Sequence, residues 1–588
     1  MGKGFSSVVN VGKVIAATVD YYVEQVAASA EEYYSARGEA QGMWLGSSAA
    51  AFGLTGDVKA AAFREVLNGK KPGEDTPLSP YFGRRKVLGI DTVFRAPKSV
   101  SLMFALGEPW IQEQVRAAHE DAVRTGFDYL ERQVAWGRQG KAGVDKVEGE
   151  GLISAAWEHR TSRAGDPLLH THVVTANMIR TKRGKWLTLD ATRIYAHAKA
   201  AGVIYQAALR KNLTEELGVK WQEVKNGLAD VEGVDREVIE AFSKRSREIE
   251  NELADQETSG SAKARQAATL QSRRAKEYEN EDSLFDEWQA EAAAFGFTPT
   301  TVHNLCGLES IDPTWPTEAS SIAQVSKKLD MTKSDSFFSR RDVIQAVADL
   351  ASPLAGAESL ERMADDWIKR NALRVRDVQP IGVLGCRGSG EEAYTTHGHL
   401  KLEENLLELA AGSIATNIAA SFPNATLTFD GLNQGQAEAV RHVLRSHNAV
   451  DCIVGDAGTG KTHMLRRLKS ACNESDWHVI GAAVSHRAKR ELELGSAIKS
   501  HTIRRLLTRL EFFEARRVLA PNPNGNVLVI DEASMASTRD LHDLLAVAAK
   551  VGTKVVLVGD EKQLPAIGAG GGFSAISQLR ESPRLTEN

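Results

Sequence analysis

Three histidines lie close enough in the chain to hold one metal ion together. His170 and His172 are separated by one residue in a β-rich run, so both side chains leave the same face of a predicted strand. His159 ends the preceding strand-like run, and residues 160–169 are typical of a hairpin loop that brings it alongside. Three imidazoles that leave coordination positions open form a catalytic rather than a closed structural site. The alternative, which the HxH pattern alone favours, is ordinary hydrogen bonding in a half-buried sheet.

The N-terminal region concentrates tyrosines, whose phenolate oxygen can act as a nucleophile in covalent catalysis. The chain has 10 tyrosines, and four of them form two adjacent pairs: Tyr21, Tyr22, Tyr33 and Tyr34. Adjacent side chains of a helix point in different directions, so a simple core stripe explains such pairs poorly. Aromatic packing is the alternative interpretation.

A phosphate-binding loop is indicated by GDAGTGKT at residues 455–462, which matches the whole pattern G-x-x-x-x-G-K-[ST]. An apolar run before it predicts a strand, and an amphipathic run after it predicts a helix. In this pattern Lys461 contacts the β- and γ-phosphates, and the Thr462 hydroxyl contacts Mg²⁺. The glycines that let backbone N–H groups approach the phosphates are Gly455, Gly458 and Gly460. We therefore expect ATP–Mg²⁺ as ligand; a glycine-rich turn without this role is the weaker alternative.

Two further strand ends carry polar residues suited to the same nucleotide. Asp531 and Glu532 follow the apolar run VLVI, where Asp531 can hold Mg²⁺ through water and Glu532 can orient and deprotonate the attacking water. Gln563 follows the run VVLV and can sense the γ-phosphate. Parallel sheets bind ligands at the carboxyl ends of their strands, so these residues are expected near the phosphate loop.

The elements that position these residues predict a multidomain fold in three parts. Residues 1–296 are expected to form an α+β domain with an antiparallel sheet and charged helices. Residues 297–428 are expected to form a mainly helical accessory region. Residues 429–588 alternate short buried strands with helices, which is typical of a parallel α/β domain.

Length and composition fit this organisation. A chain of 588 residues exceeds a single core, and its longest apolar runs fall short of the roughly 18 residues of a membrane span. The four cysteines form no CxxC motif, and no export signal is present, so we expect a cytoplasmic protein without membrane insertion. The net charge of -5 does not itself indicate a nucleic-acid binder, although a local basic stripe can be masked in such a sum.

The last quarter of the chain resembles the superfamily 1 helicases of the RecD-like branch. The resemblance rests on LNQGQ at residues 432–436, the phosphate loop, DEASM at residues 531–535 and GDxxQLP at residues 559–565. It implies a first RecA-like motor domain in which Gln436 reads the adenine. The motifs of a second motor domain, including its arginine, are not in the sequence. We therefore expect a fragment of a longer protein that does not unwind duplex DNA by itself.

The first 295 residues resemble the MobF, TraI/TrwC-like conjugative relaxases, a branch of the HUH endonucleases. The resemblance rests on the HxH motif, on the two tyrosine pairs and on DTVFRAPKSVS, which begins at Asp91. It implies site- and strand-specific nicking and rejoining of a plasmid transfer origin through a 5′-phosphotyrosine, with His159 as third metal ligand. Joining this domain to a RecD-like helicase is itself a feature of the family.

The resemblance also assigns individual roles. Tyr21 would be the first nucleophile, and Tyr33 the second, although the wide spacing of the pairs leaves the choice between Tyr33 and Tyr34 open. Asp91 would orient a histidine ligand, which we prefer, or help to remove the phenol proton. HUH enzymes generally use Mg²⁺ or Mn²⁺, whereas three imidazoles favour other transition metals, so the metal stays open.

The expected partners are single-stranded origin DNA, ATP and other proteins of a bacterial relaxosome and transfer apparatus. Candidate phosphate contacts are Arg84, Arg85, Lys86 and the hairpin at residues 180–185, which can also be a solvated edge. One rival is a rolling-circle replication initiator or HUH transposase, which shares the histidine and tyrosine chemistry. A rival of another class is a non-catalytic DNA-binding component of the transfer complex.

Overall fold

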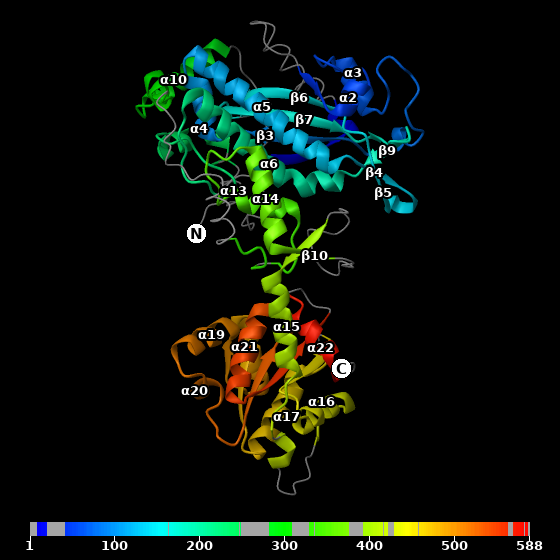
Figure 1. The fold of residues 1–588 in the computed structure, drawn as a ribbon, viewed down its shortest axis with the longest axis vertical. Coiled ribbons are helices and arrows are strands. Elements are labelled where there is room, and N and C mark those ends of the chain that lie inside the picture. Colours follow the sequence, from blue (N-terminus) through cyan, green and yellow to red (C-terminus); the bar gives the residue numbers. More distant parts are fainter. Residues whose placement is uncertain are drawn as a thin grey trace. The chain divides into compact units, whose positions relative to one another are not determined.

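The protein is represented by a computed structural model that describes residues 9–19, 42–162, 164–245, 247–248, 281–307, 329–333, 335–375, 392–415, 417–421, 429–456, 458–561, 569–580 and 582–585. The chain divides into two compact units (Figure 1). The first consists of Met1–Leu329, Arg340–Arg370 and Gly385–Glu391, and the second of Asp330–Ser339, Asn371–Leu384 and Glu392–Asn588. The predicted boundaries at residues 296 and 428 stay predictions. Four tyrosines and one glutamine of the predicted sites lie outside the described residues: Tyr21, Tyr22, Tyr33, Tyr34 and Gln563.

The first unit is built on an antiparallel sheet of five strands in the order β1-β3-β7-β6-β2. Its strands are β1 Val9–Ile15, β2 Met43–Leu45, β3 Val87–Arg95, β6 Ser154–Thr161 and β7 Pro167–Ala176. The central strand β7 pairs with β3 on one side and with β6 on the other. The predicted antiparallel α+β fold is therefore confirmed for this part of the chain.

Helices pack against both faces of this sheet. The principal helices of this unit are α2 Ser47–Ala51, α3 Ala60–Leu67, α4 Lys98–Leu106, α5 Pro109–Val134 and α6 Ala191–Leu217. The long helices α5 and α6 run side by side along the sheet (Figure 1), where the α6 residue Tyr205 lies against Phe94 of β3 with ring centroids 5.6 Å apart. On the opposite face Trp157 of β6 packs edge-on against Phe63 of α3, with ring centroids 4.6 Å apart. Burial of these aromatic rings is a major hydrophobic contribution to the sheet.

A smaller sheet of four strands extends from the same unit in the order β5-β4-β9-β8. Its strands are β4 Trp136–Gln139, β5 Asp145–Glu148, β8 Ile179–Arg180 and β9 Trp186–Leu189. The hairpin predicted around Gly184 is present, and Gly184 adopts φ 76°, a left-handed conformation that favours glycine.

The remaining described helices of the first unit are shorter. They are α7 Arg236–Ala241, α10 Glu281–Ala293, α11 Pro299–Leu305, α13 Arg340–Ala348 and α14 Ala357–Asn371, the last ending at the unit boundary. α13 packs on α6, and Asp349, just after α13, accepts a hydrogen bond from the backbone N–H of Gly227 at 2.6 Å. Among the described residues, no helix is long and apolar enough to cross a membrane.

The second unit contains a parallel sheet of six strands in the order β14-β13-β15-β16-β12-β17. Its strands are β12 Val450–Gly455, β13 His478–Ala483, β14 Ser500–Thr502, β15 Asn526–Asp531, β16 Lys554–Gly559 and β17 Arg584–Leu585. β12, β15 and β16 are buried at every position, as near-continuous apolar runs in a two-sided parallel sheet should be. The predicted parallel α/β domain is therefore confirmed.

Helices cover both faces of the parallel sheet. They are α15 His397–Ala411, α16 Gln434–Arg445, α17 Lys461–Glu474, α18 His486–Ser496, α19 Ile503–Phe512, α20 Ala515–Leu519, α21 Thr538–Val551 and α22 Gly572–Leu579. One hydrophobic cluster joins the sheet to α15, α19, α20, α21 and α22, and a second joins it to α16, α17 and α18. A short antiparallel hairpin, β10 Ala372–Val375 with β11 Ala393–Thr396, precedes α15. This hairpin was not predicted, because residues 297–428 were expected to be mainly helical.

Candidate functional site

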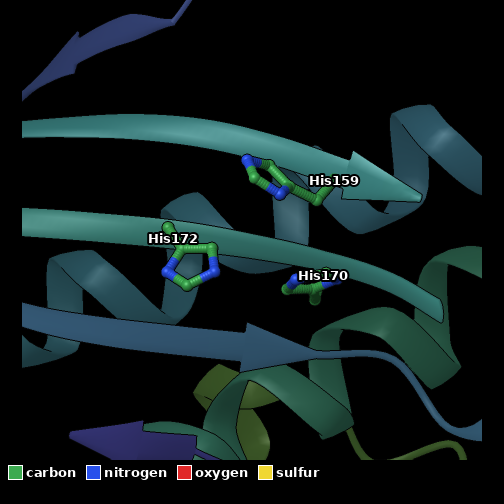
Figure 2. A group of neighbouring side chains, drawn as sticks. All are labelled: His159, His170 and His172. Atoms are coloured by element: carbon green, nitrogen blue, oxygen red, sulfur yellow. The ribbon is translucent and has the colours of Figure 1, made fainter. Parts of the chain in front are cut away.

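The three predicted metal ligands converge on one face of the antiparallel sheet. His159 of β6 lies directly opposite His170 of β7, and His172 follows two positions later on the same face. One ring nitrogen from each histidine lies within 4.8 Å of the other two. Figure 2 shows the three rings gathered from the two neighbouring strands. The hairpin predicted from residues 160–169 is what brings His159 alongside, since Thr161 pairs with Pro167 across its base.

Hydrogen bonds orient two of these rings. The Nδ1 atom of His172 lies 2.9 Å from Oδ2 of Asp91, a buried residue of β3, and the Nδ1 atom of His170 lies 2.8 Å from the carbonyl oxygen of Leu168. A carbonyl oxygen and a carboxylate only accept hydrogen bonds, so we assign a proton to each Nδ1. Each ring then keeps the lone pair of its Nε2 atom for a metal ion, which is the form that metal ligation requires.

The electrostatic environment favours a neutral His170. Burial, and then the neighbouring rings of His159 and His172, hold the pKa of His170 well below its usual value of 6.5. A neutral imidazole needs no proton displaced before it binds a metal. The donor set of three imidazoles, with a carboxylate behind one of them, therefore fits a divalent ion.

Most of the basic residues predicted to contact DNA are exposed, but one is not. Arg85 is half-buried, and its guanidinium donates hydrogen bonds to the carbonyl oxygens of Leu67, Phe82 and Asn177. Burial lowers the pKa of Arg85 to about 10. The structure gives Arg85 a fold-stabilising position, while Arg84 and Lys86 remain exposed.

The phosphate loop of the second unit joins β12 to α17, as its sequence predicts. Gly458 and Gly460 adopt φ 86° and φ 75°, so both need the left-handed region that glycine tolerates. α17 begins at Lys461, whose Nζ donates to the carbonyl oxygen of Gly455 at 3.0 Å. The helix N-terminus and the lysine therefore lie at the same turn, where a phosphate group would be stabilised.

Gln436 contacts this loop directly. Its side-chain Nε2 donates to the carbonyl oxygen of Thr459 at 3.0 Å, and its Oε1 accepts from the backbone N–H of Asn433 at 3.3 Å. A Cβ atom at Gly460 would lie 2.4 Å from that Nε2. In the structure Gln436 thus stabilises the phosphate loop through a hydrogen bond that the sequence did not indicate. Its adenine-reading role stays a prediction.

The acidic pair lies at the carboxyl end of β15. Asp531 ends the strand, and burial followed by the charge of Glu532 raises the pKa of Asp531 to about 6, while Lys461 opposes that shift. Glu532 adopts φ 53°, a left-handed conformation that costs energy for a residue with a side chain. Its Oε2 atom is buried without a hydrogen-bond partner among the described residues. A carboxyl pair held this way suits a bound cation, as the predicted Mg²⁺ role requires.

Two family models match the chain. One described as TrwC relaxase matches residues 15–295, and one described as AAA domain matches residues 431–588. The chain is similar to the multifunctional conjugation protein TraI of Escherichia coli, at 26% identity over 92% of this chain and 30% of that protein. It is also similar to the conjugal transfer protein TraA of Rhizobium radiobacter, at 27% identity over 42% of this chain and 22% of that protein. The chain therefore spans less than a third of these relatives' length.

Further similarities divide between the two halves. The ATP-dependent RecD2 DNA helicase of Deinococcus radiodurans is 28% identical over 36% of this chain and 30% of that protein. Among solved structures, the conjugative relaxase TrwC in complex with OriT DNA, metal-free, is 29% identical and covers 49% of this chain and 99% of that chain, with a TM-score of 0.43. A copper-bound structure of TrwC in complex with OriT DNA is 31% identical with the same coverage and a TM-score of 0.44.

Proposed function

We propose, from the premise that this chain belongs to the MobF family of relaxase-helicases, that its first unit nicks and rejoins one strand of plasmid transfer-origin DNA during bacterial conjugation. The second unit, in this proposal, binds ATP–Mg²⁺ as part of a DNA helicase motor. The observation that carries the nicking function is the convergence of His159, His170 and His172 on one face of the sheet, with Asp91 behind His172.

The chemical step is a transesterification that conserves the number of phosphodiester bonds. The phenolate oxygen of Tyr21 bonds to the scissile phosphorus while the bond from phosphorus to the 3′ oxygen breaks. The phenol proton passes to solvent, and the leaving 3′ oxygen takes a proton from solvent to become a hydroxyl. Because one phosphodiester replaces another, the DNA can be rejoined without an external energy source. Tyr33 or Tyr34 would perform the second transfer.

The residues of the sheet prepare the site for that step. His159, His170 and His172 would hold the divalent ion, which when bound neutralises charge growing on the phosphate oxygens. Mg²⁺ or Mn²⁺ is the proposed ion, and the imidazole donors also suit other transition metals. Asp91 orients His172 through its Nδ1 hydrogen, and the carbonyl of Leu168 does the same for His170.

The motor function rests on the second unit. Lys461 and the N-terminus of α17 would bind the β- and γ-phosphates, Thr462 and Asp531 would hold Mg²⁺, and Glu532 would orient the attacking water. Gln563 is proposed as the γ-phosphate sensor. Other relaxosome and transfer proteins are proposed as partners of the whole protein.

A covalent-adduct assay tests the nicking function. Single-stranded oligonucleotides tiled across the replicon that encodes the protein are incubated with it and Mn²⁺, and a protein–DNA adduct is sought on a denaturing gel. We expect an adduct at one oligonucleotide that disappears in Tyr21→Phe, while binding to that oligonucleotide persists. Binding of the oligonucleotides without any adduct would instead identify a non-catalytic DNA-binding protein. Full adduct yield in Tyr21→Phe would remove Tyr21 from the reaction.

A further inference from the structure

Arg95 occupies a place beside the histidine cluster that the sequence did not single out. It is the last residue of β3 and lies directly opposite His170 of β7, which in turn lies opposite His159 of β6. Residues directly opposite each other in an antiparallel sheet point to the same face. The guanidinium group therefore extends from the face that carries the three histidines, and its charge acts on His170 to lower the pKa of that ring.

The guanidinium of Arg95 has no protein partner in the described part of the chain. Its Nε atom is buried without a hydrogen bond, although the residue as a whole is half-buried, and no ion pair joins Arg95 to a described carboxylate. Burial lowers the pKa of Arg95. The backbone is nevertheless anchored, because the side-chain Nε2 of Gln206 donates to the Arg95 carbonyl oxygen at 2.9 Å. A fixed strand end thus presents an unmatched positive charge.

Other arginines of the same unit donate hydrogen bonds to backbone carbonyl oxygens. Arg85 donates to three carbonyl oxygens, and Arg210 donates to the carbonyl oxygens of Gly227 and Pro353 at 3.0 and 3.2 Å. Arg193 lies over the ring of Trp136 and donates to the carbonyl oxygen of Gln133. Arg95 differs from these three arginines, because its guanidinium donates to no carbonyl oxygen of the described residues, and removing such a group from water without a partner is costly.

A neighbouring cation, Lys98, and its acidic neighbour do not compensate the charge of Arg95. Lys98, at the start of α4, donates to the carbonyl oxygen of Pro167 at 2.6 Å and interacts with Asp166. Asp166 is also 3.7 Å from Lys244, so its charge is already shared between two lysines. The surroundings of Arg95 are therefore cationic, and the ligand that would complete them is an anion.

We propose that Arg95 binds a phosphate group of the substrate DNA strand next to the histidine centre. A guanidinium donates two parallel hydrogen bonds to phosphate oxygens, a geometry that a lysine cannot reproduce. A phosphate held opposite His170 would fix the strand so that the neighbouring phosphodiester lies at the metal ligands. This inference rests on the proposed function and adds a positioning residue to it.

The test is a methylphosphonate scan in the absence of metal, so that no cleavage occurs. The full chain and its Arg95→Gln and Arg95→Lys variants are titrated against fluorescein-labelled copies of the tightest-binding tiled oligonucleotide. In each copy one phosphate is replaced by a neutral methylphosphonate. Arg236→Gln, which removes an exposed arginine paired with Glu240, is the matched control.

We expect one methylphosphonate position to weaken binding of the wild-type chain and of Arg236→Gln by about tenfold. Arg95→Gln should bind more weakly overall and be indifferent to that same position. The slope of log affinity against log salt should fall by about 0.7 in Arg95→Gln, the value for one lost contact to a single strand. Arg95→Lys should keep the slope and recover only part of the affinity.

The phosphate-binding role and a purely structural role of Arg95 predict different effects of its removal on thermal stability and on metal affinity. Arg95→Met removes an unpaired charge and keeps the length of the side chain, so its Tm should match or exceed that of the wild type. Its Mn²⁺ affinity should be unchanged or tighter, because a cation near the site has been removed. A lower Tm with weaker Mn²⁺ binding in Arg95→Met, or an Arg95→Gln scan identical to the wild-type scan, would overturn the proposal.

The two proposals fail separately. If the wild-type chain forms no covalent adduct but the scan shows the Arg95-dependent position, the nicking function is wrong and the phosphate site stands. If the adduct forms and the scan of Arg95→Gln equals that of the wild type, the phosphate site is wrong and the nicking function stands.

Discussion

Asp91 and His172 are joined by a hydrogen bond between neighbouring strands, with 2.9 Å between Oδ2 of the aspartate and Nδ1 of the histidine. Asp91 is buried at 4% exposure, so solvent does not compete for this contact. A carboxylate in that position fixes the tautomer and the orientation of the ring as a ligand.

The first prediction concerns this contact. Asp91→Asn keeps the volume but removes the charge, so we expect Mn²⁺ affinity, measured by calorimetry, to fall by roughly 10- to 100-fold. Cleavage should fall with it at subsaturating metal. Asp75→Asn changes an exposed aspartate of the same unit and should leave both unchanged. Equal Mn²⁺ affinity in Asp91→Asn and the wild type would refute the orienting role.

The second prediction concerns the ligand contributed by β6. His159→Ala removes one of three converging imidazoles, and a site with two protein ligands holds a divalent ion less tightly. We expect weaker Mn²⁺ binding than in Asp91→Asn, since a direct ligand is lost. His303→Ala is the control, because its side chain is 54% exposed and lies on α11. Metal binding that survives His159→Ala unchanged would exclude His159 from the centre.

The third prediction is a pH dependence of stability. His119 is fully buried between Tyr205 and Thr171, at 2.8 Å from each hydroxyl oxygen, and burial lowers its pKa to about 3 from 6.5. Between those values the unfolded chain binds a proton at His119 and the folded chain does not. Stability therefore rises with pH through this window and is lost on acidification.

His119→Gln measures the size of that effect. On lowering the pH from 7 to 5, the wild type should lose about 2 kcal/mol more unfolding free energy than the variant, from linkage at this one group. Urea denaturation of both proteins at several pH values provides the measurement. Parallel pH profiles for the two proteins would show that His119 is not held neutral by the fold.

The fourth prediction concerns the phosphate loop. In Gly460→Ala the added methyl group meets Nε2 of Gln436 at 2.4 Å, and alanine is strained at φ 75°. We expect binding of a fluorescent ATP analogue to weaken at least about tenfold. A distortion that costs about 1.4 kcal/mol of binding free energy is enough for a tenfold loss.

Two comparisons separate the causes of that loss. In a Gln436→Ala background, which removes the predicted adenine contact from both proteins compared, Gly460→Ala adds backbone strain but no close contact. Gly460→Ala should therefore weaken binding less in that background than in the wild type. Gly398→Ala lies in α15, where an added Cβ would meet only Oγ1 of Thr396, at 4.0 Å, and this variant should bind the analogue normally. Wild-type affinity in Gly460→Ala would show that the loop adapts freely.

Local patterns predicted the parts of the protein in which neighbours in sequence are neighbours in space. The histidine cluster depends on one hairpin, so residue spacing was enough to predict that His159 lies alongside the other two histidines, and the structure pairs it with His170. The parallel strands followed from apolar runs, and the phosphate loop from its glycines. In each case the prediction needed only the residues of one element and of the turn next to it.

Other features depend on contacts between distant segments and could not be predicted this way. Arg85 appeared to be an exposed cation, but its partner Asn177 lies far along the chain. The hydrogen bond from Gln436 to Thr459 joins α16 to the phosphate loop. The unmatched charge of Arg95 becomes apparent only from the positions of the described residues around it. β1 was not predicted, because the strand is defined by its pairing with β3, a segment far along the chain.

The position of β7 at the centre of the five-stranded sheet has a thermodynamic consequence. Its two histidines, His159 on β6 and the carboxylate on β3 occupy three adjacent strands that form only when the whole sheet is assembled. An unfolded chain cannot present these donors together, so metal binding and global unfolding of the unit are linked equilibria. A free metal concentration of 100 times the dissociation constant would raise the free energy of unfolding by about 2.7 kcal/mol. The amide protons of β7 should consequently exchange through global opening, and their protection should increase with metal concentration.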